Sequence, residues 1–148
     1  LASSSAASDV YKRQIHNNPI RSSLKTNYYL WEPRKLNIIE MKKAVSFLVG
    51  EHDFSCFRGR LCQAKTPIKT IEYIDIIESN DELILKIKAN AFLHHMVRNI
   101  VGTVLKIGRG EKDAEWILSV LDSKDRRKAG PTAEPQGLYF IKAFYENL

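Results

Sequence analysis

Residues 68–89, IKTIEYIDIIESNDELILKIKA, contain the clearest secondary-structure signal in the chain. Apolar and polar residues alternate on both sides of Ser79-Asn80-Asp81, a triplet that is typical of a turn. Alternation with a period of two gives a strand two different faces, one of which can pack on a core. The stretch therefore predicts a β-hairpin of two antiparallel strands.

The remaining elements are assigned from helical period, capping residues and alternation. Asn37 is expected to cap a helix, because Glu40 three residues later completes a capping box, and Gly50 is a natural end for that helix. The order of elements predicts an α+β fold with a mostly antiparallel mixed sheet and helices packed on one face. The expected elements are helices over residues 38–49, 91–107 and 113–121, loops over 51–67 and 122–136, and a closing strand over 137–146.

Size and composition restrict the class of protein. A chain of 148 residues has the length of a single domain, and no apolar run approaches the roughly 20 residues that cross a bilayer. Cys56 and Cys62 are too few for a disulfide scaffold or a tetrahedral zinc site, so we expect two reduced thiols in a cytoplasmic protein. The net charge of +6 fits a polyanion partner such as nucleic acid but does not establish one.

The first fourteen residues, LASSSAASDVYKRQ, differ in character from the rest. They are mostly small and polar, have no periodicity before Val10, and lack the basic and apolar regions of a signal peptide. Residues 1–14 are therefore expected to be a non-native or disordered leader, and residues 15–148 to form the folded domain.

Arg98 is the unusual residue of the helix expected over 91–107. On a helical wheel the apolar residues fall within one arc, and His95 and Asn99 lie opposite on a face expected to be solvent-exposed. Arg98 and His94 lie at the edge of the arc, where a half-buried guanidinium can reach into a cleft. From periodicity alone, a pairing of Arg98 with a surface carboxylate is the simpler explanation. His94 and His95 diverge by roughly 100°, so no metal site is expected.

Four motifs stand in this order in the chain: Gly50–Arg58 (GEHDFSCFR), Cys62–Ile71 (CQAKTPIKTI), Asn90–Thr103 (NAFLHHMVRNIVGT) and Lys124–Phe140 (KDRRKAGPTAEPQGLYF). Together they resemble the C-terminal half of the tRNA pseudouridine synthase A family, over about Ile15–Tyr145. The resemblance implies an enzyme that isomerises uridine to pseudouridine in the anticodon stem-loop of tRNA. It also implies a homodimer that needs no cofactor and no metal.

The resemblance further implies that part of the catalytic machinery is absent. The family carries its catalytic aspartate in an arginine-threonine-aspartate-alanine-glycine motif of the N-terminal half, and this chain has no such motif. The family also places a base-stacking tyrosine two residues before the isoleucine that matches Ile15. Arg13 stands there, and Tyr11 falls on an earlier tyrosine of the pattern. The chain is therefore expected to be a fragment that is inactive alone.

Three residues are assigned to the active site by resemblance. Arg98 is expected to pair with the absent aspartate, because a guanidinium nearby keeps a desolvated carboxylate ionised. Leu138 matches the apolar residue that packs on the target uracil. His94 is expected to contact the substrate beside Arg98.

Two basic clusters are expected to contact tRNA phosphates, although each could equally be a solvated loop. The first consists of Arg58, Arg60, Lys65 and Lys69, and the second of Lys124, Arg126, Arg127 and Lys128. The alternative function is a non-catalytic RNA-binding α+β module that stacks bases on Tyr73, Tyr139 and Phe140. The absence of clustered aromatic residues with glycines on a central strand counts against that alternative.

Overall fold

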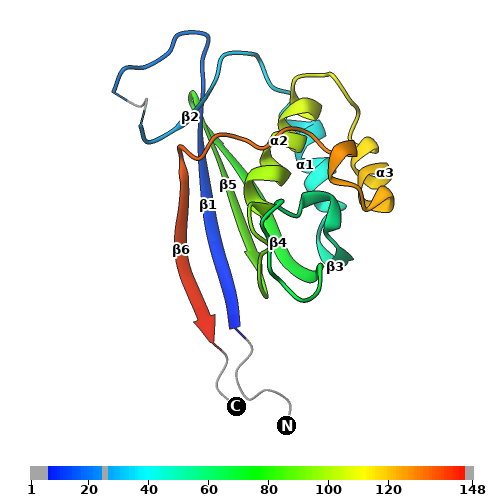
Figure 1. The fold of residues 1–148 in the computed structure, drawn as a ribbon. Helices are drawn as coiled ribbons and strands as arrows, with labels where there is room; N and C mark the ends of the chain where they lie inside the picture. The colour runs from blue at the N-terminus through cyan, green and yellow to red at the C-terminus, as the bar shows by residue number, and fades with distance from the viewer. Residues whose placement is uncertain (1–6, 25–26, 146–148) are drawn as a thin grey trace.

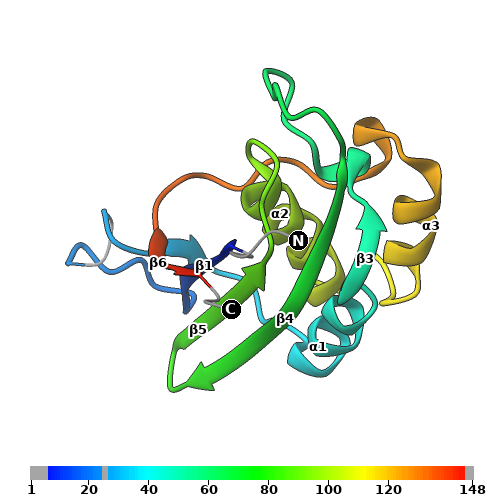
Figure 2. The same cartoon turned by 90° about the horizontal axis from the view of Figure 1, so that it is seen from below.

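The computed structural model describes residues 7–24 and 27–145, with side chains at 8–24 and 27–141. Its six-stranded sheet has the order β2-β1-β5-β4-β3, and β6 also pairs with β1. The α-helices cover one face of this sheet (Figures 1 and 2), as predicted for an α+β fold. The elements are β1 (Ala7–Asn17), β2 (Leu30–Glu32), α1 (Ile38–Ser46), β3 (Gly50–Asp53), η1 (Ser55–Phe57), β4 (Ile68–Ser79), β5 (Glu82–Ala89), α2 (Met96–Gly108), α3 (Trp116–Ser123), η2 (Arg126–Lys128) and β6 (Leu138–Tyr145).

The predicted hairpin is confirmed. β4 and β5 pair antiparallel with Ile74 opposite Ile87, and Asn80 has a φ of 55° in the turn, a conformation that asparagine tolerates better than most residues. Burial alternates along β5 from Glu82 to Ala89, so one face packs under the helices and the other is partly open. Only β1 and β2 pair in parallel, and every other strand pair is antiparallel within the described residues.

The expectation that residues 1–14 lie outside the fold is wrong for residues 7–14, which begin the central strand β1. β1 runs between β5 and β6, with Ile15 opposite Leu83 (Figure 1). Residues 1–6 of the expected leader lie outside the described residues. The strand was not recognised because Val10 and Arg13, which point to opposite faces, are both buried, so no apolar alternation is visible in the sequence.

Several element boundaries differ from the expected ones, including those of α3, which spans Trp116–Ser123 instead of residues 113–121. α1 begins as predicted, with the side chain of Asn37 accepting a hydrogen bond from the Glu40 amide at 3.1 Å, but it ends at Ser46. Residues 51–53, expected to be loop, belong to β3 (Gly50–Asp53), which pairs with β4. α2 begins at Met96 instead of residue 91, because His95 has a left-handed φ of 61° that a continuous helix cannot contain.

The loop between η2 and β6 crosses α2 at close range. A Cβ atom on Gly102 would lie 1.7 Å from the carbonyl oxygen of Pro131, so only glycine allows this approach. The Ala133 amide donates to the Arg98 carbonyl at 3.1 Å and fixes the loop beside the first turn of α2. Among the described residues, no helix has the length and apolar character to cross a membrane.

Candidate active site

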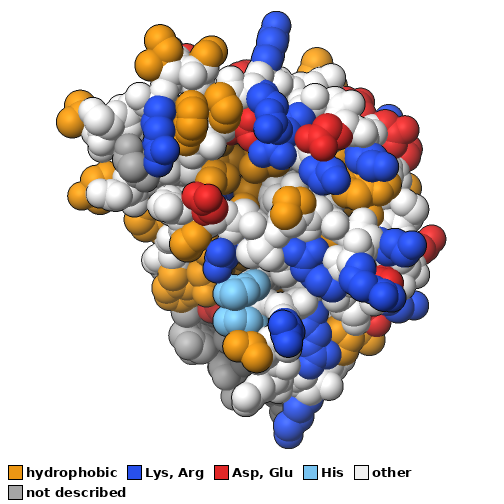
Figure 3. Space-filling view, turned by 45° about the horizontal axis from the view of Figure 1, so that its top comes forward, with side chains coloured by type: hydrophobic (Ala, Val, Ile, Leu, Met, Phe, Trp, Pro, Cys, Tyr) orange, Lys and Arg blue, Asp and Glu red, His pale blue; other side chains and the backbone are white. Residues whose placement is uncertain are grey.

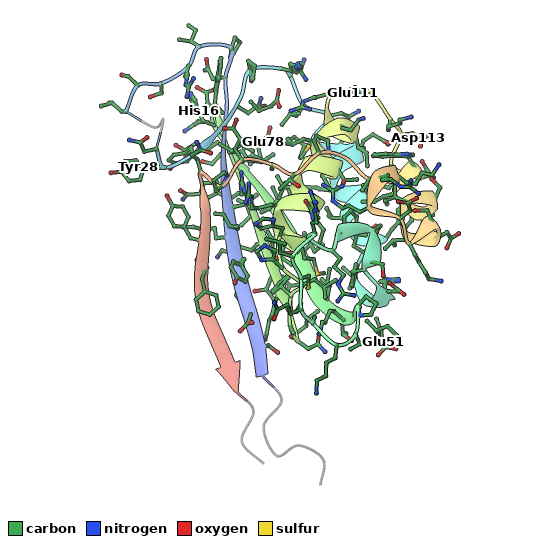
Figure 4. All side chains as sticks on the ribbon, in the orientation of Figure 1. His16, Tyr28, Glu51, Glu78, Glu111 and Asp113 are labelled. Carbon is green, nitrogen blue, oxygen red and sulfur yellow. The ribbon has the colours of Figure 1, made fainter. Side chains whose placement is uncertain are left out.

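Arg98 lies in the first turn of α2, half-buried, with its guanidinium held at two points. Its Nε donates to the carbonyl oxygen of Ala133 at 2.8 Å, and its Nη1 lies 3.2 Å from Nε2 of His95. Within residues 8–24 and 27–141, no carboxylate forms an ion pair with Arg98, so the simpler explanation of a surface ion pair is not supported. Among the exposed acidic residues labelled in Figure 4, Glu51 lies on the edge strand β3, and Glu111 and Asp113 lie between α2 and α3.

A small cavity of about 100 Å³ opens beside this guanidinium. Its walls come from β1, the segment before α2, the first turn of α2 and the start of β6. Arg98 and Leu138 both contribute, so the structure brings these two expected site residues together, whereas His94 is not among the lining residues. The cavity is lined by Tyr11, Phe92, Leu93, His95, Met96, Val97, Arg98 and Leu138.

Arg13 introduces a second guanidinium at this end of the sheet, opposite Leu138 in the register of β1 and β6. Its side chain is fully buried, and its Nη2 donates to the carbonyl oxygen of Glu134, but Nε and Nη1 have no partner. Burial, and then the charge of Arg98, lowers the pKa of Arg13 to about 10. The charge of Glu134 opposes this shift, but no carboxylate of the described residues forms an ion pair with Arg13. A buried cation without an ion-pair partner is costly, so this end of the sheet favours an anion. Sequence reasoning missed it because residues 1–14 were placed outside the fold.

His94 and His95 form a stacked pair with ring centroids 3.8 Å apart. Two histidine side chains lie side by side among lysine and arginine side chains in Figure 3. The pKa of His95 is lowered by burial and by the charges of His94 and Arg98. No group of three His, Cys, Asp or Glu side chains in the described part of the chain is arranged to bind a metal ion.

Two polar side chains that were expected to be exposed, those of Asn99 and Arg126, are instead bonded within the fold. Asn99, expected on the solvent face, is 1% exposed and donates from its amide to the Phe57 carbonyl at 2.8 Å. Its Oδ1 accepts from Arg126 Nη2 at 2.9 Å and from the hydroxyl of Thr132 at 2.5 Å. Arg126 also donates to the Gly130 carbonyl at 2.7 Å, so this guanidinium fixes the loop instead of being free for phosphate. Helical periodicity predicted an exposed Asn99 because it cannot show that η2 packs on this face of α2.

The other expected RNA-contacting residues have different environments. Arg58 donates to the Ala64 carbonyl at 2.6 Å, and Arg127 forms an exposed ion pair with Asp125 at 3.0 Å. Lysine and arginine side chains are frequent on the face shown in Figure 3. The residues with exposed or half-exposed cations are Arg60, Lys65 and Lys69 in the first cluster and Lys124, Arg127 and Lys128 in the second.

A larger cavity of about 460 Å³ lies between β2, α2 and residues 131–136. A buried ion pair lies in its wall, where Arg109 donates from Nε and Nη2 to Glu32 Oε1 at 2.9 and 2.5 Å. The two charges compensate each other, so this cavity lacks the excess positive charge found beside Arg98. The smaller cavity, beside Arg98, is therefore the candidate site for an anionic group.

The aromatic residues of the alternative function do not form one surface. Tyr139 and Phe140 are neighbours on β6 and point to opposite faces of the sheet. The hydroxyl of Tyr139 donates to the Tyr28 carbonyl at 2.9 Å, while the ring of Phe140 packs on Tyr11 with centroids 5.3 Å apart. Tyr73 lies on β4, separated from β6 by β5 and β1. A common base-stacking platform on these three residues is therefore not formed.

Comparisons with known proteins identify the family. A family model described as tRNA pseudouridine synthase matches residues 44–146. The chain is 45% identical to the tRNA pseudouridine synthase A of Pseudomonas aeruginosa over 141 residues, which is 95% of this chain and 50% of that protein. The corresponding protein of Janthinobacterium sp. (strain Marseille) is 45% identical over 142 residues, 96% of this chain and 52% of the relative.

The synthase A of Nitrosococcus oceani is 42% identical over 141 residues, covering 95% of this chain and 54% of that protein. The chain thus spans about half the length of the curated relatives it matches. The family model covers more than half of the chain, including the segment that carries Arg98 and Leu138. This chain belongs to the tRNA pseudouridine synthase family.

Proposed function

We propose that this chain is the C-terminal half of an enzyme that isomerises uridine to pseudouridine in the anticodon stem-loop of tRNA. Its relatives are about twice as long, and the catalytic aspartate of the family belongs to a motif that this chain does not contain. In the proposed enzyme that aspartate is supplied by an N-terminal half. The complete enzyme is a cytoplasmic homodimer, and this chain alone is inactive.

The single observation that carries this proposal is the environment of Arg98. Two of its nitrogen atoms are held by Ala133 and His95, and its Nη2 has no hydrogen-bond partner within the described residues. The guanidinium therefore has a fixed orientation at the cavity and an unused donor. These are the properties required of a group that receives a carboxylate from another part of the enzyme.

The reaction breaks the bond between N1 and C1′ of uridine and joins C5 to C1′ after the base has turned. The aspartate acts in its ionised form, and desolvation in a closed site opposes ionisation. Arg98 offsets that cost, because its charge is permanent and its planar fork matches a carboxylate. Leu138 provides an apolar wall for the uracil ring. His94, which is exposed and stacks on the cavity residue His95, contacts the RNA.

The tRNA is held by cations around the site. Arg60, Lys65, Lys69, Lys124 and Lys128 supply phosphate contacts, with smaller contributions from Arg58 and Arg127, which are already bonded within the chain. Arg126 contributes indirectly by fixing the loop that holds Arg98. Phosphate contacts of this kind position the RNA and make its affinity salt-dependent.

Reconstitution tests the proposal. The chain alone is expected to form no pseudouridine on an unmodified transcript of tRNA, and to gain the activity when it is fused to the N-terminal half of a relative. In the fusion, Arg98→Lys should lower the rate by about 100-fold, because an ammonium cannot hold the carboxylate at two points. Arg34→Ala, which removes an exposed arginine away from the cavity, is the matched control and should leave the rate unchanged. Turnover by the isolated chain would contradict the proposal.

A further inference from the structure

His95 has a backbone conformation that is uncommon for residues other than glycine. Its φ is 61° and its ψ is 9°, in the left-handed region, which is unfavourable for L-residues that carry a Cβ atom. Hydrogen bonds fix the chain on both sides of it. The Gly59 amide donates to the His94 carbonyl at 2.7 Å, and the Asn99 amide donates to the His95 carbonyl at 2.9 Å. Such strain is typical of positions where a side chain has to be aimed.

The consequence of this turn is that the two neighbouring histidines have different roles. The His95 ring lines the cavity, and its Nε2 meets Nη1 of Arg98 at 3.2 Å, whereas the His94 ring stacks on the outside of His95. Every nitrogen of a guanidinium carries hydrogen-bond donors only. The contact therefore requires Nε2 of His95 to accept, with the imidazole neutral and its proton on Nδ1.

We infer that His95 is a positioning residue, which fixes the guanidinium of Arg98 toward the cavity through a neutral imidazole. The Ala133 carbonyl on Nε and His95 on Nη1 together define the plane of the guanidinium and leave Nη2 for the incoming group. Without His95, Arg98 keeps one anchor and rotates about it. The catalytic meaning of this contact rests on the proposed function, but the contact itself does not.

The contact depends on pH in a defined direction. Protonation of His95 converts Nε2 from acceptor to donor and places a cation against Arg98. Burial lowers the pKa of His95 below its ordinary value of 6.5, and the charges of His94 and Arg98 act in the same direction. The contact is therefore intact at neutral pH and is lost as the pH falls through this lowered pKa. The groups around it are His94 and Arg98, Tyr11 across the cavity on β1, and Arg13 beside Arg98.

Nitrogen-15 NMR on the chain itself tests the inference. The Nε–H signal of Arg98 should shift with a midpoint equal to the pKa read from the ring nitrogens of His95. His95→Gln supplies an acceptor oxygen that does not titrate, so the Arg98 signal should become independent of pH. His94→Gln, the matched control, should leave the titration of the Arg98 signal in place. The inference would be overturned if the Arg98 signal lost its pH dependence in His94→Gln, or if it did not change with pH in the wild-type chain.

Two further measurements separate the imidazole from the backbone strain. His95→Asn keeps a residue that tolerates the left-handed conformation but is too short to reach Arg98. In the fused enzyme it should lower kcat by about 10- to 100-fold with little change in KM, because the guanidinium is misplaced. His95→Gln should keep most of kcat and move the acid limb of the pH profile to lower pH.

Equal kcat values for wild type and His95→Asn would show that His95 does not position Arg98. An inactive fusion whose NMR titration is as expected would refute the proposed function while supporting the contact.

Discussion

At the scale of single residues, the site is defined by two arginines that form no ion pair within the described residues. Arg98 is held by uncharged acceptors, and Arg13 is fully buried with two unbonded nitrogen atoms. For Arg98 the resulting positive field suits a carboxylate from outside the chain. For Arg13 the same field is destabilising, because burial and the charge of Arg98 outweigh the opposing charge of Glu134.

Arg13 therefore lowers the stability of the chain. We expect Arg13→Met, which keeps the length of the side chain and removes its charge, to raise the free energy of unfolding by roughly 1–4 kcal/mol. Urea denaturation followed by circular dichroism measures this difference. Lys12→Met, which changes the neighbouring residue on the opposite face of β1, is the control and should have a much smaller effect. A loss of stability in Arg13→Met would show that the buried guanidinium has a stabilising partner.

The neighbouring arginines of η2 should respond differently to the same substitution. Arg126→Met leaves Oδ1 of Asn99 and the Gly130 carbonyl without this donor, which should cost about 1–3 kcal/mol. Arg127→Met removes only an exposed ion pair with Asp125 and should leave the thermal midpoint almost unchanged. An equally small change in the thermal midpoint of both variants would show that the hydrogen bonds of Arg126 do not stabilise the fold.

At the scale of elements, the sequence predicted those parts of the fold whose signals are local. The β4–β5 hairpin and the start of α1 depend on alternation and on a cap, and both are confirmed. β1 could not be found, because a central strand with a buried arginine shows no alternation. The start of α2 was misplaced, because the left-handed turn at His95 is imposed by the tertiary contact of His94 with Gly59.

The residues of the candidate site also divide into those that the sequence identifies and those whose position depends on tertiary structure. Arg98 and Leu138 were identified by resemblance and lie at one cavity, whereas the proximity of His95 and Arg13 to it depends on strand register and on a backbone turn. The environment of Arg126 depends on how η2 packs against α2, which no local pattern encodes.

The contact between α2 and the loop over residues 130–137 should be sensitive to one methyl group. Gly102→Ala places a Cβ in conflict with the Pro131 carbonyl, so the loop must shift. Overpacking of this kind should lower the free energy of unfolding by about 1–3 kcal/mol. In the fused enzyme it should also lower kcat, because Ala133 on the same loop anchors Arg98. Ser119→Ala, on the exposed side of α3, is the control. An unchanged free energy of unfolding and an unchanged kcat for Gly102→Ala would show that the loop is not held against α2.

At the scale of the whole molecule, positive charge lies on the face that carries the site. A net charge of +6 alone does not establish RNA binding. However, Arg60 and Lys65 extend from the segment that contacts His94 through Gly59, Lys124 precedes η2, and Lys128 is the last residue of η2. Both groups lie on segments that are hydrogen-bonded to α2 or to the segment before it, so we expect a stem-loop whose base enters the cavity to meet both groups.

The salt dependence of RNA affinity tests this distribution of charge. For the isolated chain and an anticodon stem-loop, we expect the affinity to fall linearly on a double-logarithmic plot against salt concentration. The double variant Arg60→Gln, Lys65→Gln should reduce the slope by about 1–2, because each lost phosphate contact removes about one released counterion. Lys35→Gln, Lys42→Gln, which removes two exposed lysines before and within α1, carries the same charge change and should leave the slope unaltered. Equal slopes for both double variants would show that the RNA responds to net charge alone, and the phosphate contacts assigned to the first cluster would then be wrong.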